Sequence, residues 1–192
     1  MVGLLALAIL GFWNSYFSKL FDSLADFNGY FHFHAIMATL WLLILIIQPT
    51  LINRGKWQLH RRVGFYAHFL MGLFFISVIL LTHYQYNTEN PPHFIGVFIP
   101  FKDLLVLTVA YFIAMRYRKI AGIHARAMIA TGIVFIEPAL IRAVGTLFPK
   151  LDNRYLWTIA IIYFIIVLLI VLGRKYRPGP VSYTHLTLPT KA

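Results

Sequence analysis

Residues 53–62 read NRGKWQLHRR, a segment with four cations and no anion that joins two long apolar runs. The same composition recurs at residues 116–126 and 174–177, so eleven of the seventeen Lys and Arg residues lie in three short segments without Asp or Glu. The alternate connections, by contrast, carry acidic residues, namely Asp22, Asp26, Glu89 and Asp152. In polytopic membrane proteins the cationic loops stay on the cytoplasmic side. The pattern therefore predicts a polytopic integral membrane protein with these three segments in the cytoplasm.

The composition fits this class and excludes several others. Apolar residues make up 60% of the 192 residues and charged residues 12%, against about a quarter charged in soluble proteins. The net charge of +11 comes from residues that flank apolar spans, so we expect the lipid bilayer with its anionic headgroups, and no nucleic acid, as the partner. The absence of cysteine excludes disulfides, thiolate-held iron–sulfur clusters and thioether-linked haem.

Six apolar stretches are candidates for transmembrane helices, which need roughly 20 apolar residues each. They cover residues 2–17, 30–51, 62–84, 100–115, 125–147 and 155–172. We therefore predict an all-α, polytopic helix bundle that forms a single domain over residues 1–180. Six crossings place all three basic segments and both termini in the cytoplasm, whereas five crossings would leave at least one basic segment outside. A signal peptide is the lesser alternative for the first stretch, because it lacks a basic region and a cleavage site.

The C-terminal tail, residues 181–192, differs in kind from the rest of the chain. Back-translation of residues 181–190 matches, in one reading frame, the transposon end and adaptor used to prepare sequencing libraries. We therefore interpret this tail, including His185, as a sequencing-adaptor scar that takes no part in the fold. The alternative is a native polar tail in the cytoplasm.

Titratable side chains inside the apolar stretches are costly in a bilayer, so they are expected to face a partner, a cavity or a cofactor. At 1.5 Å per residue they form two layers, with Glu137 between them near the middle of the membrane. The inner layer holds His60, His68 and His124. The outer layer holds His32, His34, His83, Lys102, Asp103 and Arg142.

The histidines fit the layout of a two-haem helix bundle. His68 and His83 lie fifteen residues apart on the third helix, so one helix offers an imidazole to each leaflet. His34 could complete an outer axial pair with His83, and His124, or alternatively His60, an inner pair with His68. Such pairs would hold a noncovalent haem b, with Arg142 placed to meet the outer propionates. The alternative is that each histidine simply meets lipid headgroups.

A carboxyl group beside a proline marks the fifth apolar stretch. Pro138 removes a backbone donor and frees the carbonyl of Val134, so a kink is expected there. We expect Arg142 to pair with Asp103 or Glu137, because an isolated Arg in the bilayer is costly. This buried network could be a proton relay, a ligand clamp or a set of propionate partners, or it could only fix the order of the helices.

Three polar residues near the ends of these stretches have further explanations. Gln48 is assigned to the buried polar network because it recurs at a seven-residue spacing with His34 and Trp41, which places all three on one helix face. Lys102 and Asp103 have a simpler explanation, since after Pro100 they would occupy a helix start, where Asp suits the dipole and Lys can extend outward.

The chain resembles a family of small bacterial membrane proteins known only as a domain of unknown function. The resemblance covers residues 31–145 and rests on His34, Trp41, Gln48-Pro49, Leu59-His60-Arg61-Arg62, Gly64, His124, Met128 and Arg142. It implies a polytopic protein of the bacterial inner membrane and no particular activity. A looser resemblance to four-helix b-type cytochromes rests on the paired histidine layers and implies haem.

The leading functional hypothesis from sequence is therefore a b-type haem-binding membrane redox protein. A small proton-coupled transporter or carrier is the first alternative, and a non-catalytic subunit of a membrane complex is the second. The protein could also assemble as a homo-oligomer.

Overall fold

The structure, a computed structural model, describes residues 1–21, 28–88 and 94–175. The segments between these ranges and the expected adaptor scar at residues 181–192 lie outside the described residues. Within the described residues the chain forms helices and turns and no strand, so the predicted all-α fold is confirmed. The elements are α1 (Val2–Phe12), the π-helix η1 (Trp13–Phe17), α2 (Ser18–Phe21), α3 (Gly29–Asn53), α4 (Trp57–Thr88), α5 (Phe94–Arg116), α6 (Ala121–Ile133), α7 (Ile136–Leu147) and α8 (Arg154–Lys175).

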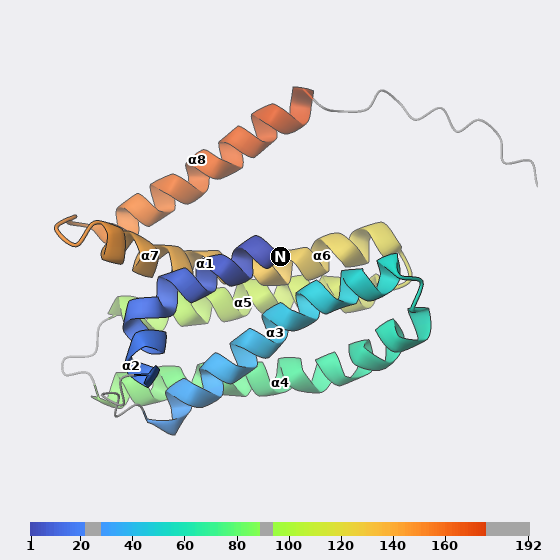
Figure 1. The fold of residues 1–192 in the computed structure, drawn as a ribbon, viewed down its shortest axis with the longest axis horizontal. Helices are drawn as coiled ribbons and strands as arrows, with labels where there is room; N and C mark the ends of the chain where they lie inside the picture. The colour runs from blue at the N-terminus through green and yellow to red at the C-terminus, as the bar shows by residue number, and fades with distance from the viewer. Residues whose placement is uncertain (22–27, 89–93, 176–192) are drawn as a thin grey trace, which may run out of the picture.

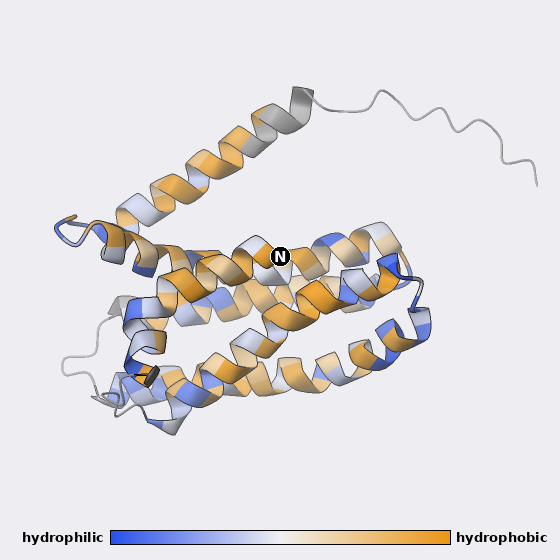
Figure 2. Cartoon of the chain, viewed as in Figure 1, coloured by the Kyte–Doolittle hydropathy of each residue, from blue (hydrophilic) through white to orange (hydrophobic). Residues whose placement is uncertain are grey.

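Four long helical units, α3, α4, α5 and the α6–α7 pair, run side by side as an antiparallel bundle (Figure 1). The α3–α4 turn needs a residue with positive φ, which Gly55 supplies at +68°. This turn and the α5–α6 turn lie at the same end of the bundle, which we call the basic end. It carries Arg54, Lys56, Arg61, Arg62, Arg116, Arg118, Lys119 and Arg126. Figure 2 shows hydrophilic residues at this end and hydrophobic residues along the middle of the helices.

Among the described residues, four helical units are long and apolar enough to cross a membrane. They are α3, α4, most of α5 (Gly96–Arg116) and the α6–α7 pair (Ala121–Leu147). The first expected span, residues 2–17, is divided between α1 and η1, and in α8 the described apolar stretch is Arg154–Leu168. A membrane protein is thus supported by four spans, and the predicted count of six is not confirmed.

The expected kink in the fifth apolar stretch is present. The helix stops at Ile133, passes through Val134 and Phe135, and restarts at Ile136, just before Glu137-Pro138. Because Pro138 has no N–H, the helical hydrogen bond to residue 134 is missing. The backbone N–H of Ala139 donates to Phe135 O at 3.4 Å, so regular bonding resumes directly after the proline. The break lets α7 leave the bundle axis at the level of Glu137.

The first helix packs parallel to α7 against the bundle (Figure 1). Met1 lies near Gly132, while Gly11 faces Ala139 and Phe12 lies beside Arg142. The backbones approach so closely at Gly11 that a Cβ there would be 2.2 Å from Ala139 O. Small residues permit such an approach between membrane helices. The parallel pairing of α1 with α7 decides which side chains surround the break.

The centre of the bundle is an apolar layer built around Trp41. This side chain is 0% exposed, and its Nε1 donates to Thr131 Oγ1 at 3.3 Å, which joins α3 to α6. Tyr111 packs edge-on against the indole, with ring centroids 5.8 Å apart, and Leu107 and Phe74 are also buried. A buried indole N–H needs a partner of this kind. The layer separates the polar side chains at the basic end from those near the break.

Candidate functional site

Three charged residues meet at the helix break, and we call them the ionic triad. Lys102 and Asp103 come from α5, and Glu137 comes from the first turn of α7. Lys102 Nζ lies 3.2 Å from Asp103 Oδ1 and donates a hydrogen bond to Glu137 Oε2. The Glu137 side chain is only 13% exposed. Within residues 1–21, 28–88 and 94–175, these contacts of Lys102 are the only ion pairs.

Arg142 does not join this triad, so its predicted pairing with Asp103 or Glu137 is wrong. Its Nη1 donates to Pro138 O at 2.9 Å, and its guanidinium lies 4.4 Å from the ring centroid of Phe12. The cause is tertiary, because Phe12 reaches this position through the parallel packing of α1 on α7. A cation over an aromatic face and a local carbonyl together replace the expected carboxylate.

The expected position of Lys102 at a helix start is also wrong. Helix α5 begins at Phe94 and continues through Pro100, so Lys102 and Asp103 lie about two turns inside the helix. A lysine at that depth no longer reaches the nearby end of its own helix easily. It turns instead to Glu137 on α7, which the break presents to α5.

The triad is unbalanced in charge and in hydrogen bonding. Two carboxylates share one ammonium group, so the fully ionised triad carries a net charge of −1. Glu137 Oε1 is buried and has no hydrogen-bond partner among the described residues. An uncompensated charge at this depth is costly. A proton or a small cation on the triad removes that cost.

A second set of polar residues, which we call the basic-end cluster, consists of Gln48, His60, His124 and the exposed His68, and of these Gln48 and His60 are in direct contact. Gln48 is 8% exposed, and its Nε2 donates to the backbone O of His60 at 3.3 Å. Gln48 Oε1 and His60 Nδ1 are both buried and unpaired within the described structure. Because Gln48 contacts the backbone of His60, Gln48 Oε1 and His60 Nδ1 lie in the same region of the bundle. Gln48 and Trp41 are both buried, as expected for their shared helix face, but Gln48 lies far from the triad it was grouped with.

Hydrogen bonds of the ring nitrogens set the tautomers of three predicted haem ligands. His68 Nδ1 donates to Gly64 O at 2.7 Å, and His124 Nδ1 donates to Ala114 O at 2.9 Å. The hydroxyl group of Ser77 donates to Phe74 O. Its Oγ therefore accepts from His34 Nδ1 at 3.2 Å. In the neutral form of each ring Nε2 is therefore the unprotonated nitrogen, through which an imidazole can bind a metal.

The two expected histidine pairs differ in how close the structure brings them. His68 packs edge-on against Tyr111 at 5.9 Å, and His124 bonds Ala114 one turn further along α5. The two histidines of the proposed inner pair, His68 and His124, thus contact neighbouring turns of α5. His34 stacks on Phe74, whereas the exposed His83 accepts at Nε2 from the Asn87 amide at 3.0 Å, so the proposed outer pair has no shared contact.

Several residues that shape these sites were not predicted as site residues. Ser77 and Phe74 orient His34, Tyr111 lies between Trp41 and His68, and Phe12 covers Arg142. Apolar periodicity marks such residues only as core or lipid-facing, so no signal in the sequence distinguishes them. Lys102 is the exception, because a lysine within an apolar stretch is itself a reason to look for a partner.

Comparison with protein-family models, with curated proteins and with solved structures finds no match to this chain. Function is therefore inferred from the ionic triad and the basic-end cluster alone.

Proposed function

We propose that this protein is a small proton-coupled carrier of the bacterial inner membrane, with the ionic triad as the group that binds and releases the proton. The observation that carries this proposal is the charge imbalance of the triad, in which Glu137 Oε1 is buried without a partner. Protonation of one carboxyl makes the triad neutral, and its loss restores a charged state that favours a different environment.

The position of the triad supports a transport role. Glu137 lies directly after the break between α6 and α7, where regular helical hydrogen bonding is interrupted. Discontinuous helices line the substrate and ion sites of many secondary transporters. The break therefore gives the triad both a titratable group and a segment that can change its geometry when the proton is gained or lost.

The basic-end cluster supplies a polar counterpart on the other side of the apolar layer. In this proposal the basic end faces the cytoplasm, as its cations favour. His60 on α4 and His124 on α6 both belong to this cluster, and imidazole side chains can accept and release protons. The buried apolar layer around Trp41 lies between the two sites.

The decisive experiment follows carboxyl protonation directly. Purified protein in lipid is titrated through neutral pH while infrared difference spectra record the C=O stretch of protonated carboxyl groups. We expect a pH-dependent band that disappears or shifts in Glu137→Gln and in Asp103→Asn. Asp152→Asn is the matched control, because Asp152 is exposed in the turn between α7 and α8. An unchanged band in both triad variants contradicts the proposal.

A transport assay then tests coupling. Proteoliposomes that contain a pH-sensitive dye are challenged with a panel of small solutes, and internal acidification is recorded. We expect at least one solute to move protons in wild type and Asp152→Asn but not in Glu137→Gln. Solute-driven acidification of equal size in Glu137→Gln would assign the proton to another group.

A haem-binding redox protein is the second candidate, and one observation favours it. His68 and His124 border neighbouring turns of α5, and both carry their ring proton on Nδ1, which leaves Nε2 for a metal. The outer pair fits less well, since Nε2 of His83 is already bonded to Asn87. A visible spectrum before and after dithionite, taken after expression with ample haem, tests this candidate. Reducible α-bands that His68→Ala removes support it, and a colourless preparation contradicts it.

A further inference from the structure

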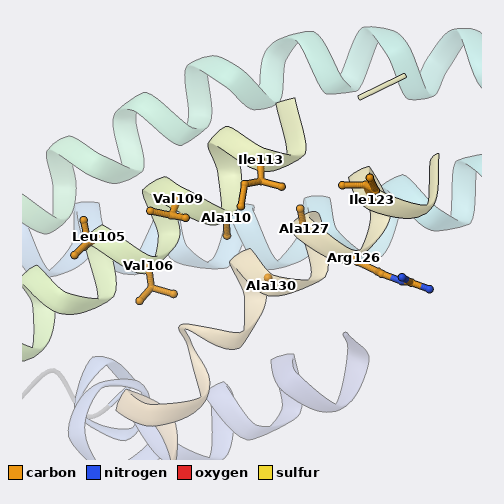
Figure 3. A pocket seen from close by; sticks show the side chains of 9 residues that line it. All are labelled: Leu105, Val106, Val109, Ala110, Ile113, Ile123, Arg126, Ala127 and Ala130. Carbon is orange, nitrogen blue, oxygen red and sulfur yellow. The ribbon is translucent and has the colours of Figure 1, made fainter. Parts of the chain in front are cut away.

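An open apolar groove runs along the outside of the α5–α6 hairpin (Figure 3). Its volume is about 690 Å³, and its lining combines small residues such as Ala110 and Ala130 with larger ones such as Val109 and Ile113. The groove exists because alanines on the two helices leave a depression between bulkier neighbours. Leu105 and Ile113, its limits on α5, are separated by roughly 12 Å of helical rise. That length covers most of one leaflet, since the whole hydrocarbon core is about 30 Å thick.

One cation lines this otherwise apolar groove. Arg126 of α6 extends from it, and Figure 3 shows its guanidinium directed away from Leu105 and Val106. Arg126 is exposed, and among the described residues it forms no ion pair and no hydrogen bond from its side chain. Arg116 ends α5, Arg118 and Lys119 lie in the turn that follows it, and no acidic residue lies between Asp103 and Glu137 in the sequence. The basic end of the groove is thus strongly cationic, and none of these cations has an acidic partner among the described residues.

We propose that this groove binds one anionic phospholipid, with an acyl chain along α5 and α6 and the phosphate at Arg126. An apolar groove that covers most of one leaflet, with a cation at its basic end, matches the two parts of such a lipid. Arg binds phosphate through two parallel hydrogen bonds, which a surface lysine cannot do. Anionic lipids are abundant in the cytoplasmic leaflet, the side that the basic end favours. This inference does not depend on the carrier function.

Lipid retention measured by native mass spectrometry tests the proposal. The protein is released from nanodiscs that contain equal amounts of phosphatidylglycerol and phosphatidylcholine, and the mass of bound lipid is recorded. We expect one phosphatidylglycerol per chain and an affinity about tenfold lower in Arg126→Gln. Arg118→Gln is the control, because Arg118 lies in the same cationic turn but not in the groove. Soluble glycerol phosphate should not displace the lipid, since it lacks the chain.

A second variant tests the acyl chain separately from the charge. Val109→Trp fills the groove from its exposed rim, whereas Ile79→Trp places the same ring on the surface of α4, and the two wild-type residues are 51% and 56% exposed. We expect Val109→Trp to lose the lipid and Ile79→Trp to keep it, with equal helix content by circular dichroism. Equal retention of the two lipids, or full retention in both Arg126→Gln and Val109→Trp, overturns the proposal. A dimer mass with the groove protected from cross-linking would assign it to a second copy instead.

Discussion

Helix α4 and the α6–α7 pair both run the length of the bundle, but α4 is continuous and the α6–α7 pair is not. The first is a single helix of 32 residues, and the second is interrupted at Val134 and Phe135. On α4 the polar groups of His68 and His83 bond to positions four residues away on the same helix. Glu137 instead bonds across to α5. The break thus presents Glu137 to α5, whereas the two histidines of the continuous helix are satisfied locally.

The largest effect is expected from removing the cation of the triad. Lys102→Met leaves two carboxyl groups in an apolar setting without a counter-charge, so we expect a loss of about 3 kcal/mol in the free energy of unfolding. Chemical denaturation in detergent measures this loss, and Lys150→Met, at an exposed turn position, is the control. Adding Glu137→Gln to Lys102→Met should recover part of the stability. A Lys102→Met variant as stable as Lys150→Met would show that the triad is not a buried network.

An intermediate effect is expected where α1 supports the broken helix. A Cβ at Gly11 would lie 2.2 Å from Ala139 O, so Gly11→Ala forces α1 and α7 apart and should cost about 1–3 kcal/mol. Gly3→Ala adds the same methyl group to the same helix, where nothing lies within 4 Å. Thermal unfolding of the two variants compares them directly. Equal melting temperatures would mean that α1 does not pack on α7 in this register.

The smallest effects should distinguish bonding between helices from bonding within one. Ser77→Ala removes the acceptor of the His34 Nδ1–H, which joins α3 to α4, and should cost about 1 kcal/mol. His83→Ala removes an exposed imidazole bonded only to Asn87 within α4, and should change stability by less than about 0.5 kcal/mol. Denaturation curves for both variants test the order. A larger loss for His83→Ala would reveal a role for that histidine beyond its local bond.

Local patterns in the sequence were sufficient for the class of protein. Apolar stretches and anion-free basic segments indicate membrane helices because hydropathy and charge are properties of a single segment, independent of its neighbours. The kink at Pro138 and the burial of Trp41 and Gln48 are predictable for the same reason, since a missing N–H and a seven-residue spacing act within one helix.

The pairing of charges was decided only by the tertiary structure. Glu137 meets Lys102 because α5 starts at Phe94 and faces the break, and Arg142 meets Phe12 because α1 lies parallel to α7. Helical periodicity states which residues share a face, but it does not state which helix lies opposite or in what register. Those relations arise from the packing of whole helices, where small residues such as Gly11 and Ala139 permit close approach. The class of this protein therefore follows from the composition of its individual segments, whereas its candidate proton site depends on contacts between helices.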